Sequence, residues 1–190
     1  KIALIIDNKI PKKIVAQVKK SIKNFDTFTV ELNANAKIKN FKVVDKLINK
    51  LLEKNLHRND CVIALGGGVL GDIVGLVASL FKRGIKFINV PTTLLSQVDS
   101  SIGGKTGVNS SYGKNLIGSF YQPEMVISDT YLLNSLPKRE IVCGYAEILK
   151  HALILDKKLF FWLQKNGKKI LNLNNKKIIQ KAIYRSCKIK

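Results

Sequence analysis

The sequence predicts an α/β fold, in which a doubly wound, mostly parallel sheet is followed by the beginning of an all-helical domain. Short apolar runs alternate with amphipathic helical stretches as far as residue 91. These apolar runs are continuous, as they are in parallel strands that are covered on both faces. From Lys138 onward the pattern is helical throughout. We therefore expect an α/β domain at residues 1–136 and the start of a helical domain at residues 137–190.

The elements of the first part follow from these runs. The expected strands are Ile2–Ile6, Phe28–Leu32, Cys61–Leu65 and Ile85–Val90, and a further short strand is expected at Met125–Ser128. The expected helices begin at Pro11, near Val43, and at Asp72 after a glycine turn. Right-handed crossovers would join strands of this kind into one sheet.

The stretch from Pro91 to Pro123 breaks the alternation. It sets Thr, Ser, Asp, Asn, Gln and two lysines among glycines, with no sustained period of 2 or 3.6. A loop this long inside a compact domain is usually functional or disordered. Disordered segments seldom carry so many Leu, Ile, Val and Phe residues. We therefore interpret this stretch as an ordered polar loop that lines a site.

The charge of the chain raises nucleic acid as a partner. The net charge is +20, from 33 basic and 13 acidic residues. Nucleic-acid readers favour arginine forks and stacking aromatics, but here the arginines are only Arg58, Arg83, Arg139 and Arg185. The lysines are spread over predicted helix faces. We therefore expect a solvated, lysine-rich surface and no nucleic-acid partner, and note that a phosphate-bearing substrate would benefit from the positive field.

The cysteines and the two ends bear on the compartment and on completeness. Cys61, Cys143 and Cys187 are odd in number and form no CxxC pair. Cys61 and Cys143 stand in apolar contexts, so we expect buried free thiols and a reducing compartment. No signal peptide and no membrane-length apolar run is visible, so a cytoplasmic protein without a membrane partner is expected. A helical stripe runs into Lys190, so we expect that the chain is cut inside a helix or continues beyond this sequence.

The first chemical motif is GGGVLG at Gly66–Gly71. It satisfies G-x-G-x-x-G between an expected strand and helix, which is a Rossmann-like setting for a dinucleotide phosphate. The acidic ribose ligand that usually ends the next strand is missing, because that strand ends Val90-Pro91-Thr92. A tight packing turn without a ligand stays open as the alternative. Asp72 could bond the adjacent backbone N–H groups or hold a ribose or nicotinamide group.

Two further groups of residues could carry chemistry. Lys105 and Lys114 lie among close-approach glycines, with Asp99, Asn109 and Asn115 nearby, and could bind phosphate or carboxylate as point charges. They could also be ordinary exposed loop lysines.

Glu147, Lys150 and His151 occupy i, i+3 and i+4 of a helix and so share one face. A surface ion pair is the better interpretation of that spacing, and two metal ligands are the alternative. His57 is expected in an exposed loop. Trp162, with Phe160 and Phe161, is expected in the core or at a contact between domains.

The combination is more specific than its parts. GGGVLGDIVG, KRGIKFINVPTTLLSQVDSSIGGKTGVN, YGKNLIGSFYQP, SLPKRE and GYAEILKHALI occur in this order. Together they closely resemble the 3-dehydroquinate synthase family, most densely from Cys61 to about Ile154.

The resemblance implies a homodimeric carbon–oxygen lyase of the shikimate pathway, which leads to chorismate and the aromatic amino acids. Its substrate would be 3-deoxy-D-arabino-heptulosonate 7-phosphate, a phosphorylated seven-carbon sugar acid. NAD would oxidise the C5 hydroxyl, phosphate would be eliminated and the ketone reduced again. Ring opening and an internal aldol reaction would then give 3-dehydroquinate.

The resemblance also implies roles for individual residues. Cofactor contacts are implied for Asn8, Lys39, Gly67, Gly68, Asp72, Thr92, Thr93, Leu95, Ser135 and Leu136. Substrate or cofactor contacts are implied for Asp99, Lys105, Lys114 and Asn115, substrate binding for Lys150, and phosphate binding across a dimer interface for Arg83. Glu147 matches a ligand of a divalent metal, usually zinc and possibly cobalt, which would polarise the C4 and C5 oxygens. His151 matches no ligand position of the family.

Two departures from the family pattern affect what is expected. The family usually has Gly-Glu near the adenosine ribose and a Lys three residues after the Glu, whereas this chain has Asn35-Ala36-Lys37-Ile38-Lys39. We therefore expect weaker NAD binding than in relatives unless Asp7 or Asn8 compensates. The family's two metal-binding histidines, in a GHTxGHA-type segment, are not in this sequence. A single Glu cannot hold a catalytic zinc, which needs about three protein ligands, so the chain alone is expected to be inactive.

Two alternatives remain. One is a related enzyme, either a cyclase acting on a different sugar phosphate or an NAD-dependent polyol dehydrogenase. The other is a basic module that binds RNA or DNA, against which the ordered glycine turns and the sparse arginines argue.

Overall fold

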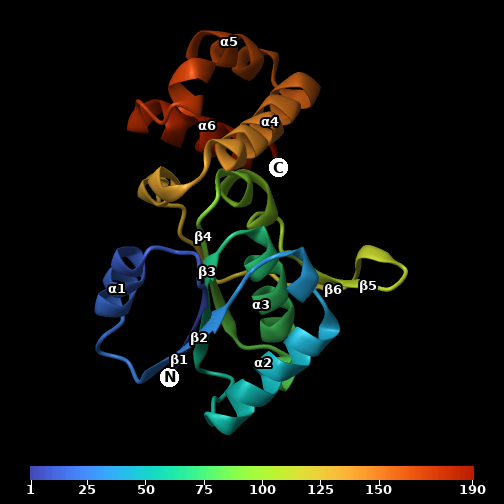
Figure 1. The fold of residues 1–190 in the computed structure, drawn as a ribbon. Coiled ribbons are helices and arrows are strands. Elements are labelled where there is room, and N and C mark those ends of the chain that lie inside the picture. Colours follow the sequence, from blue (N-terminus) through green and yellow to red (C-terminus); the bar gives the residue numbers. More distant parts are fainter.

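A five-stranded sheet forms the centre of the computed structural model, which describes residues 1–190 (Figure 1). All its neighbouring strands are parallel, in the order β2-β1-β3-β4-β7. The strands are β1 (Ile2–Asp7), β2 (Thr27–Leu32), β3 (Cys61–Gly66), β4 (Lys86–Pro91) and β7 (Met125–Val126). This confirms the predicted parallel α/β architecture, although the last strand is shorter than the expected Met125–Ser128.

Helices cover both faces of the sheet. The helix α1 (Lys12–Ser21) lies on one face, and α2 (Phe41–Glu53) and α3 (Gly68–Leu80) lie on the other (Figure 1). Successive side chains of β1 point to opposite faces. Leu4 therefore packs in the cluster that contains Ile14 of α1, whereas Ile5 packs in the cluster of α2 and α3. The strands read as continuous apolar runs because both of their faces are buried.

The glycine motif lies where β3 becomes α3. Gly66 ends the strand, Gly67 precedes the helix, and Gly68 is its first residue. The helix thus begins four residues before the expected Asp72, with glycines in its first turn. Gly66 pairs with Pro91 of β4, which places the glycine motif beside the start of the long polar stretch at the carboxyl ends of the strands.

The expectation of an irregular loop from Pro91 to Pro123 is wrong, although the stretch is ordered. It holds a π-helical turn at Ser96–Ser100 and an antiparallel hairpin of β5 (Lys105–Ser110) and β6 (Gly113–Phe120). The hairpin packs closely against α3, since a Cβ added at Gly75 would lie 2.5 Å from Thr106 Cγ2. Six of the eight β6 residues are exposed and the strands are rich in glycine, so neither shows the alternation that marks a half-buried strand.

Three helices complete the chain: α4 (Lys138–Leu155), α5 (Lys157–Leu171) and α6 (Lys176–Ile189). Asp156 caps α5 by accepting a hydrogen bond from Leu159 N at 2.8 Å, and it also accepts one from Arg185 Nη2 at 2.6 Å. The core of these helices includes Leu94 and Leu133, which precede them in the chain. The domain boundary near residue 136 stays a prediction. None of the helices combines the length and apolar character that crossing a membrane requires.

Other expectations concern single side chains. His57 is exposed, as expected, and Trp162 and Phe160 are half-buried against the helical core. Cys61 and Cys187 are half-buried free thiols, but Cys143 is exposed, which corrects the expectation of burial. Its apolar neighbours misled because the buried positions of α4 are Ile141, Gly144 and Ile148, on another side of the helix.

The thiols should therefore differ in reactivity. Burial raises the pKa of Cys61 to about 11, and burial also raises the pKa of Cys187. The thiolate is the reactive form, so iodoacetamide at pH 8 should label Cys143 first. Peptide mass spectrometry over a time course measures this order. Equal labelling rates at Cys61 and Cys143 in the folded protein would contradict it.

Candidate active site

A cleft opens at the carboxyl ends of the strands, beside the glycine motif. We call it the glycine-turn cleft, and its volume is about 630 Å³. Among its lining residues are seven that the sequence predicted as cofactor contacts: Gly67, Gly68, Thr92, Thr93, Leu95, Ser135 and Leu136. They come from three separate parts of the chain. The fold thus gathers most of the predicted cofactor residues in one place.

The floor of this cleft suits an anion. The first N–H groups of a helix have no partner within the helix and carry its positive dipole end, and α3 begins at Gly68. Gly67 brings the backbone close to the opposite wall, because a Cβ there would lie 3.2 Å from Thr93 Cγ2. Thr93 is itself fixed by Ser96, whose Oγ accepts a hydrogen bond from Thr93 N at 3.1 Å. A phosphate could therefore approach the helix N-terminus.

At the outer part of the cleft, the structure distinguishes between Asp7 and Asn8. Asp7 and Lys9 line the cleft, whereas Asn8 is exposed and lines neither of the cavities described here. The Oδ1 atom of Asp7 accepts hydrogen bonds from Lys9 N at 3.2 Å and Ala34 N at 3.4 Å. These bonds hold the carboxylate at the end of β1. The expected cofactor contact at Asn8 is thus not placed at the cleft, and Asp7 is the better candidate.

A second cavity, of about 430 Å³, lies between α3, the π-helical turn and the hairpin. It is lined by four predicted site residues: Asp72, Asp99, Lys105 and Asn115. Lys190 also lines it and contacts Asp99 through its ammonium group. Lys114 is exposed and lines neither cavity, because neighbouring side chains of β6 point to opposite sides.

Lys39 lies behind this second cavity. Its side chain is 10% exposed, and its ammonium group donates to Asp72 Oδ2 and Asn115 Oδ1, each at 2.5 Å. Burial raises the pKa of Asp72, and the ammonium of Lys39 offsets part of that rise. The backbone of Lys39 also holds the hairpin, because its carbonyl accepts a hydrogen bond from Asn109 N at 2.8 Å. Lys39 therefore supports two site residues and lines neither cavity.

Arg83 lies away from these residues. It is exposed and follows α3 in a turn before β4, at the end of the sheet opposite the cleft. The six residues of β4 span about 20 Å at ~3.3 Å per residue. This chain therefore does not bring Arg83 to its own site.

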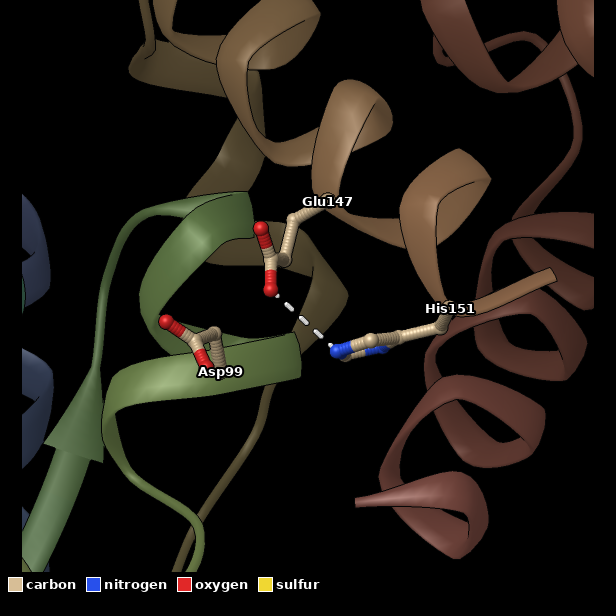
Figure 2. Close-up of side chains that lie close together, drawn as sticks. All are labelled: Asp99, Glu147 and His151. Atoms are coloured by element: carbon tan, nitrogen blue, oxygen red, sulfur yellow. Dashed lines mark ion pairs between the residues drawn. The ribbon is translucent and has the colours of Figure 1, made fainter. Parts of the chain in front are cut away.

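The predicted helix face of Glu147 and His151 lies over the π-helical turn that carries Asp99 (Figure 2). Gly144 permits this approach, because a Cβ there would lie 2.5 Å from Leu94 Cβ and 2.6 Å from Leu95 N. One potential ligand atom from each of Asp99, Glu147 and His151 lies within 4.8 Å of the other two. Lys150 contacts Glu147 Oε1, as the i, i+3 spacing predicted. The alternative of a cluster of potential metal ligands is thus present together with the ion pair.

The geometry of Glu147 fits a metal ligand. Its Oε1 atom is buried and accepts no hydrogen bond of good geometry, although Lys150 and the His151 ring are close. A buried carboxylate oxygen without such a bond is costly, and a bound cation would remove that cost.

Sequence reasoning missed Ser186 and Lys190. Ser186 is fully buried and bonds His151, and Lys190 reaches Asp99. The only signal in the sequence was their shared face on α6 at i and i+4. Burial lowers the pKa of Lys190, and the carboxylate of Asp72 opposes that shift.

Two family descriptions match the chain. The one described as 3-dehydroquinate synthase N-terminal matches residues 29–143, and the one described as 3-dehydroquinate synthase C-terminal matches residues 144–190. A 3-dehydroquinate synthase from Pelagibacter ubique (strain HTCC1062) is 60% identical over 187 residues, which are 98% of this chain and 50% of that protein. One from Bartonella tribocorum is 52% identical over 164 residues, 86% of this chain and 43% of that protein. The chain thus spans about half the length of the curated relatives it matches.

Solved structures agree with these relatives. ValA, a 2-epi-5-epi-valiolone synthase from Streptomyces hygroscopicus subsp. jinggangensis 5008 with NAD+ and Zn2+ bound, is 30% identical with a TM-score of 0.92, over 98% of this chain and 53% of that one. A 2-deoxy-scyllo-inosose synthase complexed with carbaglucose-6-phosphate, NAD+ and Co2+ is 32% identical with a TM-score of 0.77, over 81% of this chain and 42% of that one. The chain belongs to the 3-dehydroquinate synthase family.

Proposed function

We propose that this chain forms the NAD-binding part and a portion of the substrate site of a 3-dehydroquinate synthase. The observation that carries the proposal is the gathering of seven predicted cofactor residues in the glycine-turn cleft. The proteins of known structure that resemble it were solved with NAD+ and with Zn2+ or Co2+ bound, which supports NAD and a divalent metal as cofactors. The whole enzyme would convert 3-deoxy-D-arabino-heptulosonate 7-phosphate to 3-dehydroquinate and phosphate.

The residues of the cleft would bind and orient the dinucleotide. The N-terminus of α3 would receive the pyrophosphate next to Gly67 and Gly68. Asp7, at the end of β1, would accept hydrogen bonds from the adenosine ribose. Asp72 and Asp99 line the second cavity and would place the nicotinamide end against the substrate. When bound, NAD takes up and returns the hydride.

The second cavity would bind the substrate. Lys105 lines it, and Lys150 lies beside Glu147, so their ammonium groups would meet the substrate's anionic groups as point charges. Asn115 would be held toward the substrate by Lys39. Glu147 would hold the divalent metal, whose charge polarises substrate oxygens.

The wider setting belongs to the same proposal. We infer a cytoplasmic homodimer in which Arg83 and Lys114, neither of which lines a cavity of this chain, serve the phosphate or cofactor from other surroundings. The division into a cofactor domain ending near residue 136 and a helical metal-binding part is also proposed.

The reaction is tested on the whole protein with two simultaneous measurements. Phosphate release from 3-deoxy-D-arabino-heptulosonate 7-phosphate is measured beside the absorbance at 340 nm. A synthase would release phosphate with no net NADH. Accumulation of NADH would indicate a dehydrogenase, and turnover only of other sugar phosphates would indicate a different cyclase; either result would contradict the proposal.

The residue at position 36 gives a prediction about affinity. Ala36 is exposed and begins the short turn Ala36–Ile38, two residues after Ala34 of the cleft wall. A carboxylate at position 36 would add a charged hydrogen bond to the ribose, worth about 1.5–3 kcal/mol. Ala36→Glu should therefore tighten NAD binding by about tenfold or more, measured by calorimetry. Ala36→Gln, without the charge, is the matched control. Unchanged affinity in Ala36→Glu would contradict this prediction.

A further inference from the structure

We propose that Asp99, Glu147 and His151 form a divalent-cation site within this chain, in which His151 is a ligand. The inference rests on the proposed metal role of Glu147 and adds two ligands to it. Its basis is the convergence of three potential ligand atoms, all within 4.8 Å of one another, from two separate elements. Figure 2 shows Glu147 and His151 on α4 next to the turn that carries Asp99. The family resemblance puts no metal ligand at position 151, so the structure alone points to it.

The spacing of Glu147 and His151 suits two ligands of one ion. Their Oε1 and Nε2 atoms are 3.2 Å apart. Two ligand atoms bound at about 2.0–2.1 Å in a tetrahedral arrangement lie about 3.3 Å from each other. Glu147 Oε1 is buried but accepts no hydrogen bond of good geometry from the ring. The two atoms thus face one another at ligand spacing, and a cation between their lone pairs would satisfy both.

The imidazole is already held in the orientation that a metal requires. His151 Nδ1 lies 2.7 Å from the Oγ atom of Ser186, which is fully buried on α6. Metal-binding histidines usually bond a second group through the nitrogen that does not bind the metal, and this bond fixes the ring. The Ser186 bond therefore leaves Nε2 directed at Glu147. The side chain of His151 is only 9% exposed, so it has little freedom to turn elsewhere.

The charges around the cluster favour a cation at this place. Lys150 and Lys190 direct their ammonium groups at Glu147 and Asp99, so two positive charges already gather at the two carboxylates. The side chain of Lys150 is 55% exposed and can turn to solvent. A divalent ion with two carboxylates and a neutral imidazole would be charge-balanced.

The donor set indicates the kind of metal. One imidazole nitrogen and two carboxylate oxygens suit zinc or cobalt better than calcium or magnesium, which prefer oxygen ligands alone. Asp99 also lines the second cavity, so the fourth position of the ion would face the space assigned to substrate. Three protein ligands and one open position are the arrangement of catalytic zinc sites.

The test is a Co2+ titration of the 190-residue chain, followed by visible absorption and calorimetry. We expect about one Co2+ per chain and at least a tenfold weaker affinity in His151→Gln. His57→Gln, which changes the only other histidine, is the matched control and should bind like wild type. Ser186→Ala keeps all three ligands but frees the ring, and should weaken binding by about tenfold. This variant keeps the test valid if His151→Gln does not fold.

The outcomes separate this inference from the proposed function. Wild-type affinity in folded His151→Gln, or in Ser186→Ala, would overturn the site, as would an intense cobalt–thiolate band in the near ultraviolet. If the chain binds NAD but no Co2+, the site is refuted while the proposed function stands. If it binds neither, both are refuted.

Discussion

Replacing Gly144 by alanine should destabilise the protein by about 3 kcal/mol, although alanine is the better helix former. The new Cβ would lie 2.5 Å from Leu94 Cβ and 2.6 Å from Leu95 N. The second of these atoms belongs to the backbone, so relief requires α4 or the turn at Ser96–Ser100 to move. Overpacking of this kind costs about 1–3 kcal/mol or more, and the gain in helix propensity is only about 1 kcal/mol.

Urea denaturation of Gly144→Ala measures this cost. Cys143→Ala, at the exposed neighbouring position, is the control and should change stability by no more than about 0.5 kcal/mol. Because Glu147 lies one turn further along α4, the shift should also weaken cobalt binding. A Gly144→Ala protein as stable as wild type would show that α4 does not pack on this turn as described.

The Lys39→Met variant should lose about 3 kcal/mol of stability at pH 7. Lys39 and Asp72 form a largely buried ion pair, with side chains 10% and 20% exposed. Removing one partner leaves a buried charge uncompensated, which typically costs about 3–5 kcal/mol. It would also free Asn115 and loosen the hairpin. Lys37→Met, two residues away and exposed, is the matched control.

The loss in Lys39→Met should depend on pH in one direction. Burial already raises the pKa of Asp72 above its ordinary value, and removal of Lys39 would raise it further. A group whose pKa is raised on folding binds more protons in the folded state, so stability falls as pH rises through that range. The loss should therefore be smaller at pH 5 than at pH 7 in chemical denaturation. A loss that is equal at both values, or larger at pH 5, would contradict this account.

The alternation of strands and helices was predictable because it depends on local patterns. Continuous apolar strands flanked by amphipathic helices leave few other arrangements, and the structure has the parallel sheet they indicate. The start of α3 was misplaced because glycines weaken the helical signal of its first turn. The hairpin was missed because its strands are largely exposed and rich in glycine, so that packing on α3 rather than pattern defines it.

The candidate site was predictable where residues follow a motif and not where they depend on distant contacts. Gly67, Thr92 and Leu136 lie together in the cleft as the motifs implied. The position of Lys39 behind Asp72 depends on contacts between residues 33 and 76 positions apart, which no local pattern reveals. The same holds for Ser186, which meets His151 across 35 positions.

The central claim is that the glycine-turn cleft binds NAD, and calorimetric titration of the 190-residue chain with NAD tests it most directly. We expect one NAD per chain, and at least a hundredfold weaker binding in Gly67→Val. The backbone at Gly67 has φ −76°, which any residue can adopt, so the variant should fold, with its new side chain beside Thr93 in the cleft. Equal NAD affinity in wild type and folded Gly67→Val, or no binding by the folded wild type, would contradict the claim.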